Sequence, residues 1–269
     1  MKNYTLKCQK LTKIIENCTK NDVVIAFSGG VDSALLLKIV CDYAKESNVN
    51  VYAVTINSVL NAVKEIDFTQ QIAKEFGAIH KIIELDPLKD AKIYDNPKNR
   101  CYLCKKYMFE RICEFAKSVN ADCIMDGTNF DDTQTYRPGL KALDESGIIS
   151  PLVMAEFTKE DVRKLASEYG VSASNKPSTP CLATRFEYGT TLTQDKIKIV
   201  EEAEEYIKYL GFYNVRVRVH DSLARVEVDY NDVPKLVENR ESIINKLKEL
   251  GFKYITVDLE GFVSGSMDK

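Results

Sequence analysis

The sequence predicts an α/β protein, a parallel sheet with helices on both faces followed by a smaller α+β unit. In the first two-thirds of the chain, short apolar runs alternate with segments whose apolar residues recur at helical spacing. Strands that alternate with helices form parallel sheets with right-handed crossover connections. The length of 269 residues suits two domains.

Each element of the predicted sheet domain follows from its own pattern. Residues 23–27 read Val-Val-Ile-Ala-Phe, an apolar run typical of a strand buried on both faces. Residues 5–19 place apolar side chains along one face, as an amphipathic helix requires. The predicted elements are, in order, helix 5–19, strand 23–27, helix 34–43, strand 51–56, helix 61–76, strand 81–85, helix 102–118 and strand 123–125.

A change of pattern marks the end of this first domain. Residues 171–190 contain two prolines and little periodicity, which predicts an ordered loop or linker. We expect the second unit to contain helix 193–210, strands 215–219 and 224–228, helix 239–250 and strand 254–257. The boundary is placed near residue 187, which gives domains 1–186 and 187–269.

Composition excludes several classes of protein. The formal net charge is −3, whereas proteins that clamp nucleic acid usually carry a basic excess, so we do not expect a nucleic-acid partner. No run approaches the roughly 20 apolar residues of a membrane span, and we expect no membrane association. Charges are scattered through the first 18 residues, which lack the apolar core of an export signal. These features predict a cytoplasmic protein.

The most informative motif is Ser28-Gly29-Gly30-Val31-Asp32-Ser33, between the buried strand and the next helix. The glycines allow a tight turn whose backbone N–H groups face an anion, and the helix adds the positive end of its dipole. The hydroxyls of Ser28 and Ser33 are suited to donating to phosphate, and Asp32 to holding Mg²⁺. The loop lacks the Gly-Lys-Ser/Thr of a Walker A motif, so it does not imply γ-phosphoryl transfer. The alternative is an ordinary strand-to-helix turn.

This motif resembles the SGGxDS signature of the ATP pyrophosphatase (PP-loop) superfamily, whose fold is like that of the adenine nucleotide alpha hydrolases. The resemblance implies that ATP is split between its α and β phosphates and that AMP is placed on a carboxylate or carbonyl oxygen. The nucleotide-binding residues implied by the motif and the resemblance are Ala26, Ser28, Gly29, Gly30, Val31, Asp32, Ser33, Ile56 and Gly127.

Eight cysteines fall into two groups. Five have apolar or helical neighbours and are interpreted as small core residues, namely Cys8, Cys18, Cys41, Cys113 and Cys123. The other three stand apart. Cys101 and Cys104 form a C-x-x-C at the start of a helix, beside cations, and Cys181 lies in a loop after Pro180.

Four interpretations of these three cysteines compete. Structural zinc needs four ligands, and the two histidines, His80 and His220, do not form a ligand-spaced pair. A redox pair would leave Cys181 unexplained, and simple burial is the third interpretation. The fourth is a [4Fe–4S] cluster on three thiolates, whose open iron binds a sulfide. With an adenylating loop, this arrangement would activate a carboxylate and then deliver sulfur.

Several strings together make the chain similar to the LarE family of ATP-dependent sulfur transferases. They are residues 28–33, 99–106, 127–132, 136–139, 180–185 and 261–267, and they span nearly the full length. The resemblance implies adenylation of the carboxylates of pyridinium-3,5-biscarboxylic acid mononucleotide and their conversion to thiocarboxylates, in biosynthesis of the nickel-pincer nucleotide cofactor. It also implies a sulfide or other sulfur donor and a homo-oligomer, with the second domain serving substrate binding and oligomerisation.

Family members differ in their source of sulfur. In one type, a cysteine matching Cys181 gives up its own sulfur and becomes dehydroalanine. In the other, cysteines matching Cys101, Cys104 and Cys181 hold a [4Fe–4S] cluster that carries an extra sulfide. Because all three are present, we favour the cluster type, with ATP, Mg²⁺ and the cluster as cofactors and Cys181 as a catalytic cluster ligand. The sacrificial route stays open.

Cations are expected to meet this doubly acidic mononucleotide. Arg216 and Arg218 lie two apart on a predicted strand and so share a face, which suits a bidentate grip on phosphate. The alternative is a solvated strand face. Arg185 is expected near the cluster or the substrate. Lys105 or Lys106 is expected to neutralise the phosphates, with Lys106 taken as catalytic.

Three other functions remain possible on this reading. A tRNA thiolase shares the adenylating loop, although one C-x-x-C and the acidic balance argue against it. An amide-forming ligase of the superfamily would leave the three cysteines without a role. A non-catalytic nucleotide sensor would bind ATP without forming AMP and pyrophosphate. We further expect Asp132 and Arg137 to line the site and His220 to be structural.

Overall fold

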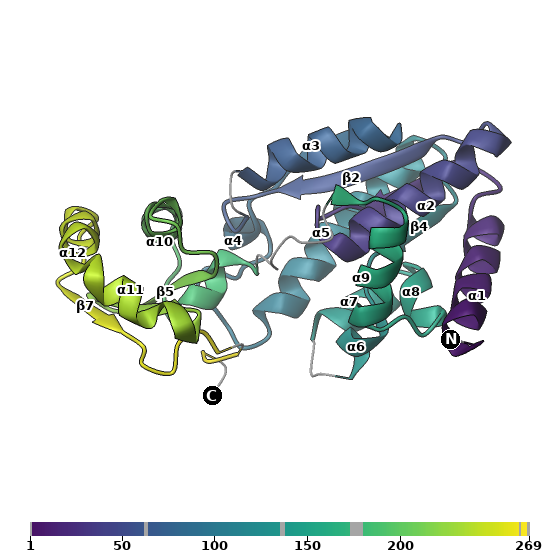
Figure 1. Cartoon of the computed structure of the whole chain (residues 1–269). Helices are drawn as coiled ribbons and strands as arrows, with labels where there is room; N and C mark the ends of the chain where they lie inside the picture. The colour runs from purple at the N-terminus through teal and green to yellow at the C-terminus, as the bar shows by residue number, and fades with distance from the viewer. Residues whose placement is uncertain (1, 62–63, 135–137, 173–179, 264, 268–269) are drawn as a thin grey trace. The chain divides into compact units, whose positions relative to one another are not determined.

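A computed structural model describes residues 2–61, 64–134, 138–172, 180–263 and 265–267 (Figure 1). The packing divides the chain into two units. The first comprises Met1–Ser58, Val63–Ala91 and Asn99–Ser178, and the second comprises Val59–Ala62, Lys92–Lys98 and Thr179–Lys269. The division at residue 187 made from sequence stays a prediction, as does the role given to each domain.

The first unit is built on a four-stranded parallel sheet with strand order β3-β2-β1-β4. Its strands are β1 (Val23–Ala26), β2 (Val51–Asn57), β3 (Ile79–Glu84) and β4 (Cys123–Asp126). β1 lies in the middle and pairs with β2 on one side and β4 on the other. All four carboxyl ends therefore meet at one edge, where ligands of such sheets bind.

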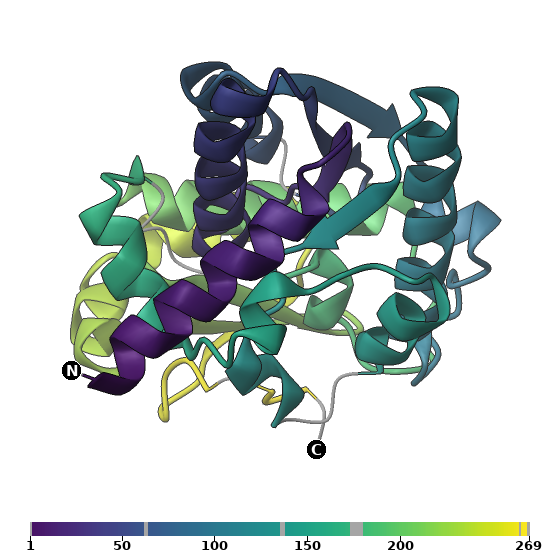
Figure 2. The same cartoon turned by 90° about the vertical axis from the view of Figure 1, so that its right-hand side faces the viewer.

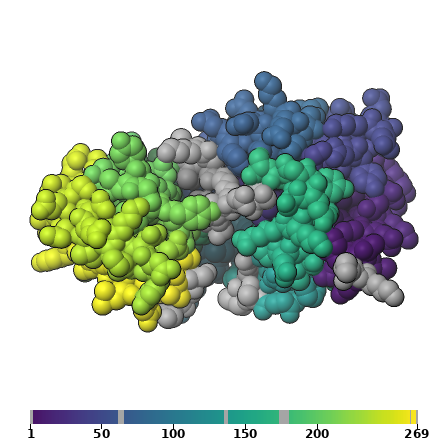
Figure 3. Space-filling view, in the orientation of Figure 1, coloured from purple at the N-terminus to yellow at the C-terminus, as the bar shows by residue number. Residues whose placement is uncertain are grey.

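Helices cover both faces of this sheet (Figures 1 and 2). Val23, Ile25 and Phe27 point into one hydrophobic core and Val24 into the other, the alternation expected of a strand. The first core is closed by α1 (Lys2–Cys18), α2 (Val31–Ser47), α3 (Lys64–Phe76), α8 (Pro151–Met154) and α9 (Lys159–Glu168). The second is closed by α5 (Arg100–Ser118) and α7 (Gly139–Glu145). The space-filling view shows the outer side of α3 as a blue surface (Figure 3).

The second unit contains a three-stranded mixed sheet with strand order β5-β6-β7. Its strands are β5 (Val215–His220), β6 (Leu223–Val228) and β7 (Tyr254–Val257), with β5 and β6 antiparallel and β6 and β7 parallel. The remaining elements are η2 (Leu182–Arg185), α10 (Gln194–Tyr209), η3 (Tyr230–Asp232), α11 (Val233–Glu238) and α12 (Arg240–Glu249). The apolar face of α10 is fully buried through Ile197, Val200 and Ile207.

The predicted fold class, a helix-covered parallel sheet with a smaller α+β unit, is confirmed. Between β4 and the loop region, short elements appear that the sequence reading did not specify: α6 (Phe130–Thr133), α7, α8 and α9, while α4 (Pro87–Asp90) follows β3. Over the described residues, no helix is both long and apolar enough to cross a membrane. Of the five cysteines predicted to be core residues, Cys41 is buried and the other four are half-buried.

Candidate active site

The turn between β1 and α2 has the geometry of an anion site. Gly29 has a φ of +75°, a conformation that favours glycine, and an added Cβ would lie 2.8 Å from Thr69 Cγ2. Gly30 is the N-cap of α2 in an extended conformation, and no side chain caps the helix. The Ser28 and Ser33 hydroxyls lie 3.1 Å apart. The first N–H groups of a 17-residue helix are thus available beside two hydroxyls.

The chain after β4 packs directly against this turn. A Cβ built on Gly127 would lie 2.6 Å from Ser33 N and 2.7 Å from Ser33 Cα. The main chain just after β4 therefore approaches the main chain of α2 more closely than a side chain at residue 127 would permit. Ala26 and Ile56 also sit at carboxyl ends, on β1 and β2. The residues predicted to bind nucleotide from this half of the chain therefore share one edge of the sheet.

The carboxylate of Asp32 is held by two groups. Its Oδ1 accepts a hydrogen bond from Asn129 Nδ2 at 3.2 Å, and its Oδ2 is paired with the Lys159 ammonium. Asn129 is the N-cap of α6, and Lys159 is the first residue of α9. Sequence reasoning missed Lys159. The local sequence around Lys159, Thr158-Lys159-Glu160-Asp161, forms a capping box. A capping box marks the start of a helix but does not indicate which residues pack against that start.

A buried carboxyl lies beside this turn. Asp126, the last residue of β4, accepts hydrogen bonds from the Ser150 and Thr128 hydroxyls. Burial raises the pKa of Asp126, while the two hydroxyls act in the opposite direction. Asp132 closes the capping box of α6, and its place in the wall of the site stays a prediction. Arg137, the other predicted wall residue, lies outside the described residues.

Two neighbouring lysines of α5 occupy different environments. Lys106 is exposed, with its Nζ 3.4 Å from Glu145 Oε2 and 3.5 Å from the Tyr102 hydroxyl. Lys105 is half-buried and packs against Gly139, where an added Cβ would lie 2.4 Å from Lys105 Cδ. The catalytic role of Lys106 stays a prediction, and Lys105 is the lysine whose charge acts on Asp126.

The three singled-out cysteines fall in both units. Cys101 is exposed and Cys104 half-buried on the first turns of α5, with Cys104 Sγ 3.7 Å from Met108 Sδ. Cys181 is exposed and caps η2 in the second unit. Within the described part of each unit, no three His, Cys, Asp or Glu side chains are grouped as a metal site. Convergence of the three thiols stays a prediction.

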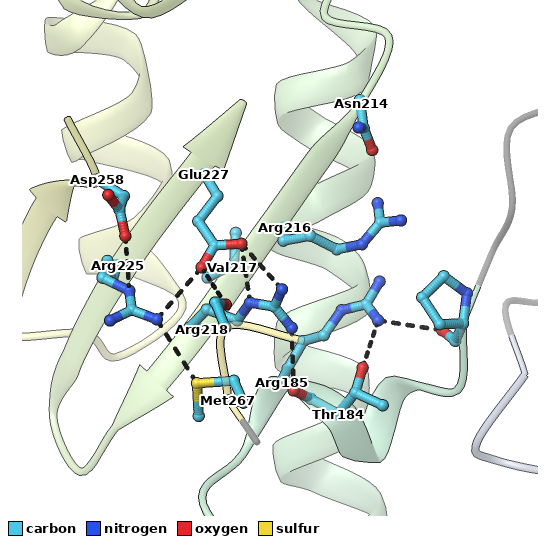
Figure 4. A network of polar contacts seen from close by, with 12 residues as sticks. Thr184, Arg185, Asn214, Arg216, Val217, Arg218, Arg225, Glu227, Asp258 and Met267 are labelled. Carbon is cyan, nitrogen blue, oxygen red and sulfur yellow. Dashed lines mark hydrogen bonds and ion pairs between the residues drawn. The ribbon is translucent and has the colours of Figure 1, made fainter. Parts of the chain in front are cut away.

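The main chain at Cys181 is fixed by a buried arginine. Arg185 is fully buried, and its Nη1 donates to Pro180 O at 3.0 Å and to the Thr184 hydroxyl at 2.8 Å (Figure 4). Its Nε and Nη2 donate to the two carboxylate oxygens of Glu204 at 2.8 and 2.9 Å. Glu204 also accepts from Val217 N at 2.9 Å. Arg185 thus connects the Cys181 turn to α10 and β5.

The β5 arginines are also buried. Arg216 and Arg218 are only 5% and 4% exposed, so the alternative of a solvated strand face is wrong. Arg218 donates to Glu227 Oε2 at 2.9 and 3.0 Å and to Thr184 O at 3.0 Å (Figure 4). Arg216 stacks over the Phe262 ring, with its guanidinium carbon 4.9 Å from the ring centroid. The pKa of Arg216 is lowered to about 10, mainly by burial and next by the charge of Arg185.

The donor groups can be compared with what the implied cofactors require. Mg²⁺ prefers carboxylate oxygens, and Asp32 already holds one cation, the Lys159 ammonium, at the phosphate turn. This donor set fits Mg²⁺. Cysteine thiolates are the usual ligands of iron–sulfur clusters, and Cys101, Cys104 and Cys181 are accessible or half-buried. Their chemistry fits such a cluster.

The structure has a parallel sheet with a glycine turn that leads into a helix at its carboxyl edge, and the chain matches the PP-loop domain family over residues 3–132. The protein is therefore a PP-loop protein. It is 39% identical over 264 residues to the pyridinium-3,5-bisthiocarboxylic acid mononucleotide synthase of Lactiplantibacillus plantarum. That match covers 98% of this chain and 95% of the relative. The chain belongs to the LarE family of ATP-dependent sulfur transferases, as the sequence resemblance predicted.

Two further relatives place the chain in context. A protein of uncharacterised function from Synechocystis sp. is 34% identical over 248 residues, 91% of each chain. The tRNA-specific 2-thiouridylase MnmA of Rickettsia bellii is 23% identical over 249 residues, which cover 78% of this chain and 66% of that protein.

Proposed function

We propose that the chain adenylates the carboxylates of pyridinium-3,5-biscarboxylic acid mononucleotide and converts them to thiocarboxylates, a reaction of nickel-pincer nucleotide biosynthesis. One observation carries this proposal: Gly127 packs against the backbone of Ser33 and so completes a phosphate turn that begins with Gly29. The similarity to a synthase of the bisthiocarboxylic mononucleotide supports the choice of substrate. We also propose that the protein acts in the cytoplasm as a homo-oligomer.

In the first half-reaction, ATP lies with its phosphates on the N-terminal N–H groups of α2. A substrate carboxylate oxygen forms a bond to the α-phosphorus, the bond to the bridging oxygen breaks, and pyrophosphate leaves. Mg²⁺ held by Asp32 would offset charge on the phosphates. Lys159 lies within contact of Asp32 and brings a second cation to the same phosphates.

In the second half-reaction, a sulfur nucleophile attacks the activated carbonyl carbon and AMP leaves with the original carboxylate oxygen. We propose that Cys101, Cys104 and Cys181 hold a [4Fe–4S] cluster, which supplies an iron with an open position for sulfide. The alternative is that Cys181 donates its own sulfur. Arg185 supports either route, because it fixes the carbonyl groups at residues 180 and 181.

The substrate phosphate is assigned to β5. Arg185 and Arg218 each face a buried glutamate, and Arg216 stacks on Phe262 and donates to Val215 O at 2.7 Å. Burial lowers the pKa of Arg216 most, and the neighbouring Arg185 and Arg218 act in the same direction, while Glu204 and Glu227 act against it. A phosphate dianion would stabilise the charged form of this buried guanidinium, so Arg216 is proposed as the direct contact and Arg218 as its support.

The adenylation step is tested by pyrophosphate release in the presence of the dicarboxylate mononucleotide. Asp32→Ala and Ser33→Ala are expected to lower the rate by about a hundredfold or more, since both remove groups from the phosphate turn. Ser47→Ala at the far end of the same helix serves as the control. Full pyrophosphate release by both turn variants would contradict the proposal.

The sulfur source is tested by metal content and mass. Anaerobic reconstitution is expected to give about four irons per chain, and Cys104→Ala should lose them. Cys113→Ala, on the same helix, is the matched control. A loss of one H₂S mass at Cys181 after turnover would instead establish the sacrificial route.

A second candidate is a tRNA thiolase, supported by the similarity to the 2-thiouridylase from Rickettsia bellii. A tRNA substrate requires salt-dependent retention of tRNA. The excess of acidic over basic residues, 40 against 37, argues against it. Retention of tRNA together with tRNA-stimulated pyrophosphate release would favour this candidate over the mononucleotide.

A further inference from the structure

A histidine that no step of the proposed reaction uses is linked by hydrogen bonds to the phosphate turn. His80 is the second residue of β3 and lies beside Ala53 in the parallel pairing with β2. Its Nε2 is 2.9 Å from the hydroxyl oxygen of Thr55, two residues further along β2. The Thr55 hydroxyl donates to Phe27 O at 2.9 Å. Groups from three neighbouring strands therefore form a chain that ends directly before Ser28.

The surroundings hold this chain in place. Thr55 is buried, with 4% of its surface exposed, and His80 is half-buried. The imidazole meets the Phe27 ring edge-on, at an interplanar angle of 79° and a centroid distance of 6.5 Å. Phe27 itself belongs to the first hydrophobic core. The imidazole is thus oriented by a ring contact as well as by a hydrogen bond.

The direction of each hydrogen bond follows from the groups present. A carbonyl oxygen can only accept, so the single hydroxyl proton of Thr55 is given to Phe27 O. Toward the imidazole, the Thr55 oxygen must therefore accept, and the proton of that bond belongs to His80 Nε2. Burial lowers the pKa of His80 below its ordinary 6.5, which favours the neutral ring at pH 7. The neutral ring then carries its one proton on Nε2 and none on Nδ1.

The bond from Thr55 also fixes the main chain where the phosphate turn begins. Phe27 N donates to Val54 O at 2.8 Å, so β2 holds both polar main-chain groups of Phe27. In a planar trans peptide unit, the carbonyl and the following N–H point in opposite directions. The position of Phe27 O therefore sets the direction of the Ser28 N–H, at the first residue of the turn.

We propose that His80 is a positioning residue of the ATP site, acting on the phosphate turn through Thr55. His80 Nε2–H orients the Thr55 hydroxyl, that hydroxyl holds the Phe27 carbonyl, and the Ser28 amide is thereby aimed at the bound phosphates. The assignment rests on the proposed function, in which the phosphates of ATP lie on this turn. It gives a role to the one polar side chain of β3 that contacts Thr55.

The first test is the dissociation constant of Mg·ATP for the full-length protein, measured by isothermal titration calorimetry. His80→Leu keeps an apolar contact for Phe27 but removes the donor, and should raise the constant by about tenfold. His80→Gln places an amide donor the same number of bonds from Cβ, and should bind within about twofold of the wild type. The control is Ile79→Ala, which changes an exposed residue on the opposite face of β3 and should bind as the wild type does.

Thermal unfolding of the same samples shows that each variant is folded. An unchanged constant in folded His80→Leu would overturn the proposal, and so would equal weakening in His80→Leu and His80→Gln. Wild-type protein that binds no Mg·ATP would instead contradict the proposed function.

A double-mutant cycle tests whether His80 acts through Thr55. Thr55→Val removes the hydroxyl at nearly constant shape and should weaken Mg·ATP binding about as much as His80→Leu does. Adding His80→Leu to Thr55→Val should then change the constant by less than about twofold, because the connecting group is already absent. Losses that simply add would overturn the proposed route.

The protonated nitrogen can be identified without ATP by nitrogen-15 NMR of the imidazole rings. The chain has two histidines, so the signals of His80 are those missing from His80→Gln. At pH 8 we expect the Nε2–H form of His80. A proton on Nδ1 instead would remove the donor and overturn the proposal, whatever the outcome for the proposed function.

Discussion

Replacing Gly127 with alanine tests whether close backbone contact builds the phosphate turn. The new Cβ would lie 2.6 Å from Ser33 N, whereas ordinary contact begins at 3.4 Å, so residue 127 and the start of α2 must separate by about 0.8 Å. The φ of Gly127 is not positive, so alanine introduces contact and no backbone strain. Overpacking of this kind typically costs about 1–3 kcal/mol of folding free energy. A displacement of about 1 Å at reacting groups lowers turnover by about a hundredfold.

The assay is pyrophosphate release at saturating ATP, together with denaturant unfolding. Gly147→Ala is the control for a loss of folding stability alone, because its added Cβ meets no atom within 4 Å while its positive φ of 65° costs about 1–2 kcal/mol of backbone strain. We expect Gly147→Ala to keep near wild-type turnover and Gly127→Ala to lose it while remaining folded. Equal turnover in wild type and Gly127→Ala would refute the role of this contact.

Three further predictions address single side chains. Lys159→Gln should lower the rate of pyrophosphate release by about tenfold or more. It should change the free energy of unfolding by under about 1 kcal/mol, because the ion pair of Lys159 with Asp32 is partly exposed. Lys164→Gln is the control, and an unaltered rate in Lys159→Gln would refute the prediction. Glu204→Gln should destabilise the second unit by about 3–5 kcal/mol in denaturant unfolding, because it leaves the buried Arg185 charge uncompensated. The control, Glu202→Gln, changes an exposed residue and should not destabilise the unit. Equal denaturant midpoints for Glu204→Gln and the wild type would contradict the argument. Burial raises the pKa of Asp126 above its ordinary 3.8, so its protonated form favours folding at low pH and that stability is lost as pH rises through the raised pKa. The difference between the denaturant midpoints of the wild type and Asp126→Asn should therefore shift against the wild type as pH rises from about 4 toward neutrality. A difference that does not change with pH would contradict this prediction.

The central strand of the first unit, β1, is predictable because nearly all of it is buried. The run 23–27 has no polar position and is short, which is typical of an interior strand, and the glycines directly after it mark the turn into the next helix. The region after β4 is harder to predict. Helices of four to ten residues are too short for a clear period, and α6 and α9 are specified by the capping boxes at Asn129 and Thr158.

The charged parts of the candidate site show where sequence reasoning stops. The pattern of β5 indicated that Arg216 and Arg218 share a face, but not that the face is buried. The burial of these arginines depends on Glu227 of β6, which accepts hydrogen bonds from Arg218, and on Phe262, whose ring packs against Arg216. Likewise, the pairing of Lys159 with Asp32 joins residues 127 positions apart. Spacing along the chain carries no information on partners that only folding brings together.

The start of α9 beside Asp32 has a consequence for the acid–base behaviour of the phosphate site. Lys159 is the first residue of that helix, so the amino ends of α2 and α9 approach the same carboxylate. Main-chain amides keep their partial positive charge at every pH at which the fold persists, unlike ammonium groups. The attraction of these two helix ends for a polyphosphate should therefore persist in alkaline solution.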